Sequence, residues 1–256
     1  MIGSGNVATH IAAALKNAGH KIIQVYSPTY HNAALLAYHV HAEAINDIAA
    51  INSGTDLFII SVKDDAITSI AQSLSVYKKL TVHTSGATDL ISISSCNPLA
   101  GVFYPLQTFS KFKELNFLQV PICIEGKNDT VTKQLEELAL TVSNNVYRVN
   151  SHQRKILHLA AVFACNFPNN LYAIAQQILS QHDLSFDLLK PLILETAQKV
   201  QNYSPADVQT GPAIRKDENI MNFHLNLLAG DIGLQHLYSA LSQSIIKMGI
   251  SQQEDK

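Results

Sequence analysis

The feature that most constrains this chain is a glycine-rich turn at its start, in the sequence MIGSGNVATHIA. Gly3, Gly5 and Ala8 match the spacing Gly-x-Gly-x-x-Gly/Ala of dinucleotide-binding folds. There the first glycine makes a tight bend, the second lets the backbone approach a pyrophosphate, and the third small residue lets the next helix pack closely. The motif alone is also compatible with a glycine turn that binds nothing. A strand at residues 21–27, at the right distance beyond the helix, favours the dinucleotide interpretation.

Only Met1 and Ile2 precede the turn, although the strand before it lies at the centre of the sheet in this kind of fold. Two residues cannot fill that position, and each buried backbone group left unpaired costs about 1–3 kcal/mol. The sequence therefore predicts one of two situations. Either Met1 is an internal residue of a longer natural chain, or the strand survives as a stub in a poorly stable protein.

The first 150 residues alternate short β-branched runs with helical stretches, which predicts βα alternation and a mainly parallel sheet. The remaining residues carry helical patterns without strand signals. We therefore predict an α/β Rossmann-like dinucleotide-binding domain in residues 1–150 and an all-α C-terminal substrate and dimerisation domain in residues 151–256. The linker is not rich in Pro, Gly or Ser, so we expect the two domains to pack closely around a cleft. Strands are expected at 21–27, 56–62, 80–85, 101–106, 120–126 and 144–149, and the helices between them at 6–20, 32–40, 65–74 and 129–142.

Composition excludes several functions. The net charge is −2 and the basic residues are scattered, which argues against nucleic acid and membrane surfaces as partners. A basic leader and an apolar run of about 18 residues are both missing. The three cysteines, Cys96, Cys123 and Cys165, are too far apart for a disulfide framework or a zinc site, and His39 and His41 have no evident third ligand. We expect a cytoplasmic protein without a metal that acts on a small molecule.

The cofactor prediction depends on the segment that follows the strand at residues 21–27. A carboxylate there would bind the ribose of NAD, but the sequence offers Tyr26-Ser27-Pro28-Thr29. Hydroxyl donors without an acid favour NADP, with NAD as the alternative; an ordinary surface turn has the same composition. The predicted cofactor-binding residues are Gly3, Ser4, Gly5, Asn6, Val7, Ser27, Thr29, Ser61, Val62, Thr84 and Gly86.

Two of these groups follow later strands, at Ser61 and at Thr84–Gly86, and would face the same crevice. Gly86 permits a close approach of the ligand, and Ser85 is a candidate catalytic donor toward the nicotinamide ribose or the substrate. His83 is either an acid–base group or a core residue. A lone histidine inside a strand favours the core.

The helical half offers a polar stripe at i, i+4 spacing, formed by His158, Asn166 and Asn170 with Val162 between them. His158 is the candidate proton donor, Asn166 would orient a reacting carbonyl or imine, and Asn170 would contact the substrate. Hydrogen bonding within a domain contact is the alternative. Pro168 leaves the helical register beyond it open.

Arg215, which follows a Gly-Pro turn, is the candidate ligand of a substrate carboxylate or a cofactor phosphate. Asp217 is expected to cap the next helix. A surface Arg–Asp pair that steadies the turn is the alternative role for Arg215.

Taken together, the stretches IGSGNVATHIA, DLFIISVKDDAI, VHTSGA, FYPLQTF, HLAAVFACNF and TGPAIRKD resemble a bacterial family that joins a Rossmann-like domain to an uncharacterised helical domain. That family is described as NADP-binding oxidoreductases and is similar in plan to pyrroline-5-carboxylate reductase, ketopantoate reductase and the deazaflavin-dependent NADP oxidoreductases. Asn166 and Asn170 resemble the paired Asn of ketopantoate reductase. Val162 stands where its catalytic Lys is expected, which argues against that activity, and Pro28 stands where relatives commonly have Arg.

The leading hypothesis is an NAD(P)-dependent oxidoreductase that transfers hydride between nicotinamide and a small carbonyl or imine acid held in the cleft. The alternative is a dinucleotide-binding sensor or assembly protein without catalysis, because no Lys or Tyr stands out in the sequence as a proton donor. The apolar helical domain also predicts a homodimer.

Overall fold

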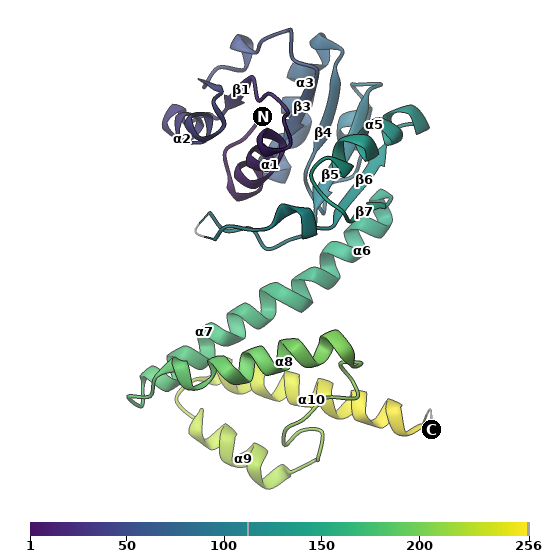
Figure 1. Ribbon diagram of the computed structural model, residues 1–256. Helices are drawn as coiled ribbons and strands as arrows, with labels where there is room; N and C mark the ends of the chain where they lie inside the picture. Colours follow the sequence, from purple (N-terminus) through teal and green to yellow (C-terminus); the bar gives the residue numbers. More distant parts are fainter. Residues whose placement is uncertain (112, 255–256) are drawn as a thin grey trace. The chain divides into compact units, whose positions relative to one another are not determined.

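The computed structural model describes residues 1–111 and 113–254, with side chains up to residue 250 (Figure 1). The chain forms two compact units, residues 1–171 and residues 172–256. Every strand of the described chain lies in the first unit. The boundary after residue 150 between a dinucleotide-binding domain and a helical domain was predicted on function, whereas this division is based on compactness. The boundary after residue 150 stays a prediction. No helix in the described part of the chain is long and apolar enough to span a membrane.

The first unit is built on one twisted sheet in two parts. The order is β2-β1 in one part and β3-β4-β5-β6-β7 in the other, and all pairs are parallel except β5 with β6. The predicted α/β fold class with a mainly parallel sheet is confirmed. The strands are β1 (Gln24–Tyr26), β2 (Glu43–Ile45), β3 (Leu57–Ile60), β4 (Leu80–His83), β5 (Ala100–Pro105), β6 (Ile122–Gly126) and β7 (Val146–Arg148).

Ile2 joins the two parts of the sheet, because it forms parallel bridges with both Tyr26 and Ile60. Its N–H donates to the carbonyl of Ile59 at 2.8 Å, and its carbonyl accepts the N–H of Ser61 at 2.7 Å. The stub considered in the sequence analysis therefore occupies the central position and supplies backbone partners to both neighbours.

The expectation of βα alternation throughout is wrong between β5 and β6. These strands pair antiparallel, with Phe103 opposite Ile124, and the described residues of the connection between them form a 3-10 turn at Phe117–Gln119. A parallel return would need a crossover helix, and the described part of this connection contains none. Strand β2 was not predicted, because its residues Glu43, Ala44 and Ile45 include only one β-branched residue.

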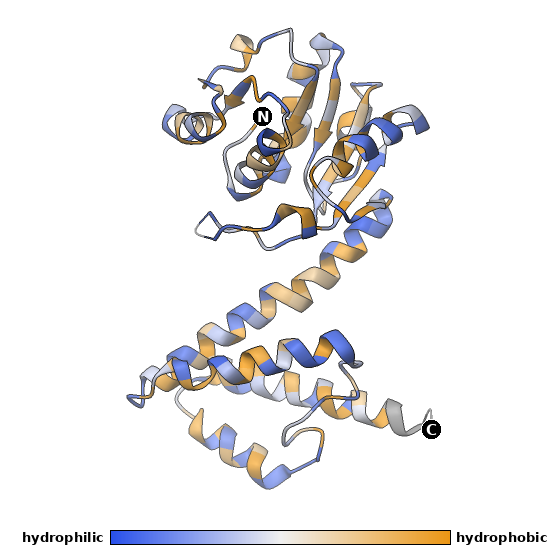
Figure 2. Ribbon diagram, viewed as in Figure 1, coloured by the Kyte–Doolittle hydropathy of each residue, from blue (hydrophilic) through white to orange (hydrophobic). Residues whose placement is uncertain are grey.

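Helices pack on the sheet through small and branched apolar residues. The main core includes Ala8, Ile11 and Ala12 of α1 together with Val82 and Phe103 from the central strands, all fully buried. Figure 2 shows the apolar residues concentrated on the strands and on one side of the covering helices. These helices are α1 (Asn6–Asn17), α2 (Tyr30–Val40), α3 (Ile67–Leu74), the short α4 (Ile91–Ser94) and α5 (Asp129–Leu140).

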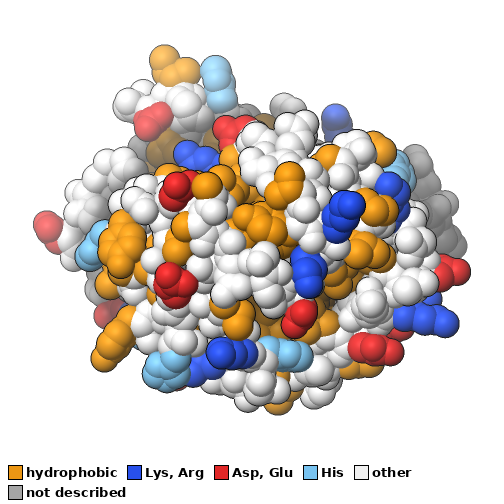
Figure 3. All heavy atoms as spheres, turned by 90° about the horizontal axis from the view of Figure 1, so that it is seen from above, with side chains coloured by type: hydrophobic (Ala, Val, Ile, Leu, Met, Phe, Trp, Pro, Cys, Tyr) orange, Lys and Arg blue, Asp and Glu red, His pale blue; other side chains and the backbone are white. Residues whose placement is uncertain are grey.

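On the outer face drawn in Figure 3, Lys and Arg side chains are interspersed with Asp and Glu. Both signs of charge share this face, so it does not present a continuous basic stripe.

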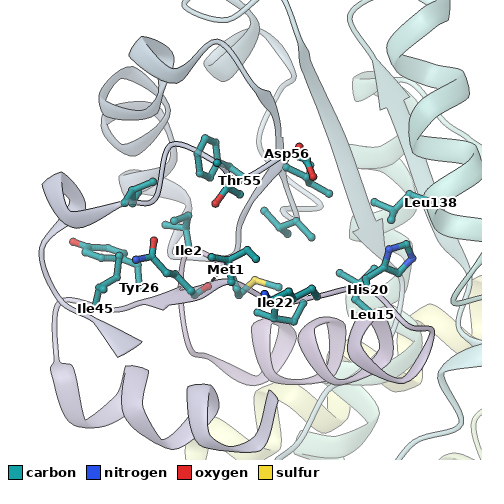
Figure 4. Close-up of a pocket in the computed structure, with 18 residues that line it drawn as sticks. Met1, Ile2, Leu15, His20, Ile22, Tyr26, Ile45, Thr55, Asp56 and Leu138 are labelled. Atoms are coloured by element: carbon teal, nitrogen blue, oxygen red, sulfur yellow. Dashed lines mark hydrogen bonds between the residues drawn. The ribbon is translucent and has the colours of Figure 1, made fainter. Parts of the chain in front are cut away.

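A cavity of about 430 Å³ lies at the amino ends of β1 and β3 (Figure 4). Met1, Ile22 and Phe58 line it, and His20 and Leu138 stand at its side. The glycine-rich turn follows the carboxyl end of the stub, so this cavity belongs to the opposite edge of the sheet. None of the residues predicted for a site lines it.

Beyond β7 the chain is helical. Asn150 and Gln153 form a reciprocal capping box at the start of α6 (Ser151–Ala161). A π-helical turn at Val162–Asn166 and then α7 (Phe167–Ser180) follow, and α7 contains the division between the two units. Pro168 has no N–H to donate, and a widened turn before it accommodates that loss. The other helices are α8 (Lys190–Asn202), α9 (Glu218–Leu227) and α10 (Ile232–Glu254).

His83 is a core residue, which is the interpretation that the sequence favoured. Its ring is fully buried, Nδ1 accepts the N–H of Ser85 at 3.2 Å, and Nε2 has no partner among the described residues. Burial, together with the nearby charge of Arg154, lowers the pKa of His83 to about 3. The folded protein therefore keeps this imidazole neutral.

We expect His83 to make the protein less stable in acid. Its folded pKa is below the unfolded value, so this contribution is complete above about pH 6.5 and is lost as the pH falls toward 3. In that range His83→Asn should flatten the slope of unfolding free energy against pH by up to about 1.4 kcal/mol per pH unit. Urea unfolding followed by tyrosine fluorescence at several pH values measures the slope. An unchanged slope would contradict the expectation.

Candidate functional site

A cavity of about 770 Å³ opens at the carboxyl ends of the parallel strands and is lined entirely by residues of the first unit. Ligands of open α/β sheets bind at this edge. Its walls are the glycine turn, the ends of β1, β3, β4 and β5, and one side chain of α6. The lining includes Gly3, Ser4, Gly5, Asn6, Val7, Ser27, Pro28, Ser61, Val62, Thr84, Ser85, Gly86, Tyr104, Gln107, Phe109 and His158.

The glycine turn has the shape that a pyrophosphate requires. Gly3 has a φ of +111°, and a Cβ there would lie 2.1 Å from the carbonyl oxygen of Ser61. At Gly5 a Cβ would meet nothing within 4 Å, so open space adjoins the backbone. No side chain caps α1, and its first turn carries no acidic residue. The first N–H groups of α1 are therefore available to a phosphate.

The ribose end of the cavity differs in part from the prediction. Ser27 is buried and lines the cavity, whereas Thr29 is exposed, lies outside the lining and is the N-terminal cap residue of α2. Deeper in the site, the hydroxyl of Thr84 donates to the Ser61 hydroxyl at 3.1 Å. The ends of β3 and β4 are thereby tied together at the cavity wall.

Ser85 shapes the loop after β4. Its hydroxyl oxygen accepts the N–H groups of Ala87 at 3.1 Å and Thr88 at 2.9 Å. This arrangement folds the backbone so that Gly86 faces the cavity. The Ser85 hydroxyl keeps its own hydrogen for donation, so its predicted catalytic role stays a prediction.

Three residues from different elements meet beside this loop. The Tyr104 hydroxyl, at the end of β5, lies 3.2 Å from Nδ1 of His158 on α6. A Cβ at Gly86 would lie 2.7 Å from that Nδ1 and 2.9 Å from the Tyr104 ring. Burial raises the pKa of Tyr104 to about 12, so its hydroxyl is protonated at neutral pH. Phenol and imidazole thus form a hydrogen-bonded pair in the wall of the cavity.

Arg154 lies one helical turn before His158, on the same side of α6. The contacts that Arg154 makes therefore fix the position of His158 as well. Its guanidinium is fully buried and donates to the Glu125 carboxylate and to the Thr88 carbonyl, each at 2.5 Å. Ser151 also donates to Glu125, at 2.7 Å. The first turns of α6 are therefore attached both to β6 and to the loop that carries Gly86.

The other predicted residues of the helical half are not part of the lining of this cavity. Asn166 and Asn170 are exposed and absent from its lining, and Arg215 is exposed in the second unit. Asp217 caps α9 by accepting the N–H of Ile220 at 3.2 Å, as predicted. The functional roles assigned to Asn166, Asn170 and Arg215 stay predictions.

Tyr104, Gln107 and Phe109 line the cavity but were not chosen from the sequence. The only signal was the stretch FYPLQTF, which carried part of the family resemblance without assigning a role. Phe109 approaches the glycine turn, where its carbonyl accepts from the Asn6 side chain at 3.1 Å. Nζ of Lys111 donates to the Ser4 carbonyl at 2.9 Å, so the segment after β5 contacts the turn at a second point.

The fold and the cavity define a dinucleotide-binding protein of the Rossmann class. Residues 1–85 match the family model described as NADP oxidoreductase, coenzyme F420-dependent, and residues 120–245 match a domain of unknown function, DUF2520. The structure is similar to that of a Bacteroides fragilis protein provisionally named an NADP oxidoreductase. The two are 46% identical, with a TM-score of 0.92 over 96% of each chain.

At this identity and coverage the chain belongs to the same family, that of Rossmann-fold NADP oxidoreductases with a DUF2520 domain. The recognition made from the sequence and the prediction of NADP, with NAD as the alternative, are confirmed at this level.

More distant structures share the fold. An imine reductase from Myxococcus stipitatus in complex with NADP+ has a TM-score of 0.64 at 13% identity, over 99% of this chain and 93% of that one. A pyrroline-5-carboxylate reductase from Coxiella burnetii has a TM-score of 0.59 at 15% identity, over 98% and 96%. No curated protein matches the sequence.

The two glycines of the turn provide a matched pair of substitutions. Gly5→Ala should fold normally, because its Cβ enters open space, but should weaken NADPH binding at least tenfold by occupying the place of the pyrophosphate. Gly3→Ala should destabilise the fold itself, because its Cβ would overlap the Ser61 carbonyl. Thermal unfolding and NADPH fluorescence titration separate the two effects. Unchanged NADPH affinity in the Gly5 variant would contradict this use of the turn.

Proposed function

We propose that this protein transfers hydride between NADP and a small carbonyl or imine acid bound in the 770 Å³ cavity. The observation that carries the proposal is that the glycine turn and His158, an imidazole able to donate a proton, line the same cavity. Hydride transfer to a C=O or C=N carbon leaves a basic oxygen or nitrogen that needs a proton. A protein that only sensed the dinucleotide would have no use for such a group at this place.

The residues divide the work by position. The N–H groups that begin α1 would hold the pyrophosphate, and Ser27 would face the ribose without the carboxylate that repels a 2′-phosphate. The nicotinamide, when bound, would supply the hydride. Ser85 and His158 are the proposed catalytic donors at the other end of the cavity.

The substrate class is supported by two reductases of the same fold. One is named an imine reductase and the other a pyrroline-5-carboxylate reductase, and both names describe reduction of C=N bonds. Asn166, Asn170 and Arg215 are retained as proposed substrate-side residues, with Asn166 also proposed as a catalytic orienting group.

The first experiment tests the cofactor and His158 together. NADPH at millimolar concentration should raise the thermal unfolding midpoint by several degrees, because a ligand that binds only the folded state stabilises it. His158→Gln should retain that shift and lose about 10²–10⁴-fold in kcat with a keto acid or cyclic imine. Leu157→Met is the control on the same helix. Absence of stabilisation by NADPH and by NADH would refute the proposal, and stabilisation without turnover would favour the sensor.

We also propose that a second copy of the chain covers the helical unit. Among the described side chains of residues 172–250 only Ala213 is buried, although a unit of this size normally hides much of its apolar surface. Exposed apolar area on this scale marks a protein interface. The exposed large apolar residues are Tyr172, Leu184, Leu188, Leu192, Leu194, Val200, Tyr203, Ile220, Phe223, Leu227, Ile232, Leu241 and Ile250.

The occupant proposed is another copy because the exposed residues are spread over all the helices of this unit (Figure 2). A surface distributed in this way needs a large partner of similar apolar character, as in permanent homodimers. The homodimer predicted from the sequence is retained here in that form.

Light scattering after size-exclusion chromatography should give a mass of about twice 28.0 kDa. Leu192→Lys combined with Leu227→Lys should shift the protein toward monomer and lower its unfolding midpoint, because two charges would enter the interface. Gln198→Lys, at an exposed polar position of α8, should leave the mass unchanged. A monomeric wild-type protein at micromolar concentration would contradict the proposal.

A further inference from the structure

We propose that Tyr104 is a catalytic acid of this site: its hydroxyl gives the proton to the reduced substrate atom, and His158 then replaces that proton. This inference rests on the proposed function and adds a residue to it.

Tyr104 lies on a rigid, buried strand at the wall of the cavity. The tyrosine lies near the end of β5, a strand whose residues are all buried, and its backbone pairs with Cys123 of β6. Its side chain is 9% exposed, and that remainder faces the cavity that also contains the glycine turn. A rigid strand end is the kind of support that a catalytic group needs.

The phenol of Tyr104 is in direct contact with the imidazole of His158. The two rings meet edge to face, with centroids 6.2 Å apart, and the phenol oxygen lies 3.2 Å from Nδ1. Gly86 approaches so closely that any side chain there would overlap both rings. The loop after β4 therefore closes over the pair and fixes the separation of its two polar atoms.

The hydroxyl of Tyr104 is protonated at neutral pH. Burial raises the pKa of Tyr104 to about 12; the neighbouring Cys123 acts in the same direction and Arg154 opposes it. The phenol therefore holds its proton at neutral pH, and a phenolate left behind would be costly in this environment. A donor of this kind works only if a second group reprotonates it during the reaction, and His158 is in contact with it.

Two other polar side chains at this end of the cavity, Ser85 and Arg154, also bind within the protein. The Ser85 oxygen accepts two backbone N–H groups that hold its loop together. The Arg154 guanidinium binds Glu125 and Thr88. Tyr104 with His158 is thus the pair in this part of the described site that combines a donor with a group able to recharge it.

In the proposed reaction the substrate receives one hydride and one proton. The substrate carbon accepts hydride from the reduced nicotinamide, and the electron pair of its C=O or C=N bond moves onto the oxygen or nitrogen. That atom takes the hydrogen of the Tyr104 hydroxyl as the phenol O–H bond breaks. The phenol oxygen takes the proton from Nδ1 of protonated His158, and His158 regains a proton from water. One hydride and one proton are consumed for each substrate reduced.

Tyr104→Phe is the decisive variant, because it removes one oxygen and keeps the ring against Gly86. With NADPH and either pyruvate or 1-pyrroline-2-carboxylate as probes, kcat should fall about 10²–10⁴-fold. The NADPH dissociation constant should change less than about twofold, since the phenol contributes to proton transfer rather than to binding. Tyr147→Phe, an exposed tyrosine on β7, is the matched control and should match the wild type.

A double substitution tests the relay. If Tyr104 and His158 act as one unit, Tyr104→Phe combined with His158→Gln should lose little more kcat than the worse single variant. Losses that multiply would overturn the relay. The double cycle also protects the inference from a folding artefact, because each variant is first checked by its unfolding midpoint and NADPH affinity.

The outcomes separate this inference from the function beneath it. Failure of the wild type to bind NADPH, or to reduce either probe, overturns the proposed function and this inference with it. Full activity of Tyr104→Phe in a protein that turns over a probe overturns the inference alone. Equal loss of NADPH binding and turnover in that variant indicates a structural role and also overturns it.

Discussion

The buried guanidinium of Arg154 is the interaction on which the arrangement of the site depends. It joins α6 to Glu125 on β6 and to the carbonyl of Thr88 after β4, so three segments far apart in sequence converge on one cation. A charge without solvent requires such partners, and removing one partner from a buried pair costs about 3–5 kcal/mol. The helix that presents His158 is thereby held in a fixed register against the sheet.

The same charge contributes to the protonation states around it. Burial is the main reason that the pKa of His83 is lowered, and the positive charge of Arg154 acts in the same direction, so that ring stays neutral. Arg154 also lowers the cost of a phenolate at Tyr104, although burial remains the larger effect on that pKa. Arg154 thus adds to the effect of burial at the core histidine and opposes the effect of burial at the phenol.

The dinucleotide turn was predictable from the sequence. Gly3 and Gly5 stand where the backbone needs a conformation or a free space that a side chain would not allow, and both requirements are local to the turn. Strands with β-branched runs and helices with a regular apolar period were also predictable. The antiparallel return of β6 was not, since the strand pattern carries no information on direction. Tyr104 and Arg154 were missed for a related reason: their partners His158 and Glu125 are 54 and 29 residues away.

The π-helical turn at Val162–Asn166 shows how local irregularity changes what a spacing means. In a regular α-helix each residue advances by about 100°, so Asn166 would lie about 80° around the axis from His158. A π turn accommodates about one extra residue, which brings an eight-residue separation close to seven and reduces that angle to about 20°. His158 and Asn166 therefore lie closer to one face of the helix with the π turn than they would in a regular α-helix. That alignment does not make the stripe one site, because His158 lines the cavity and Asn166 is exposed.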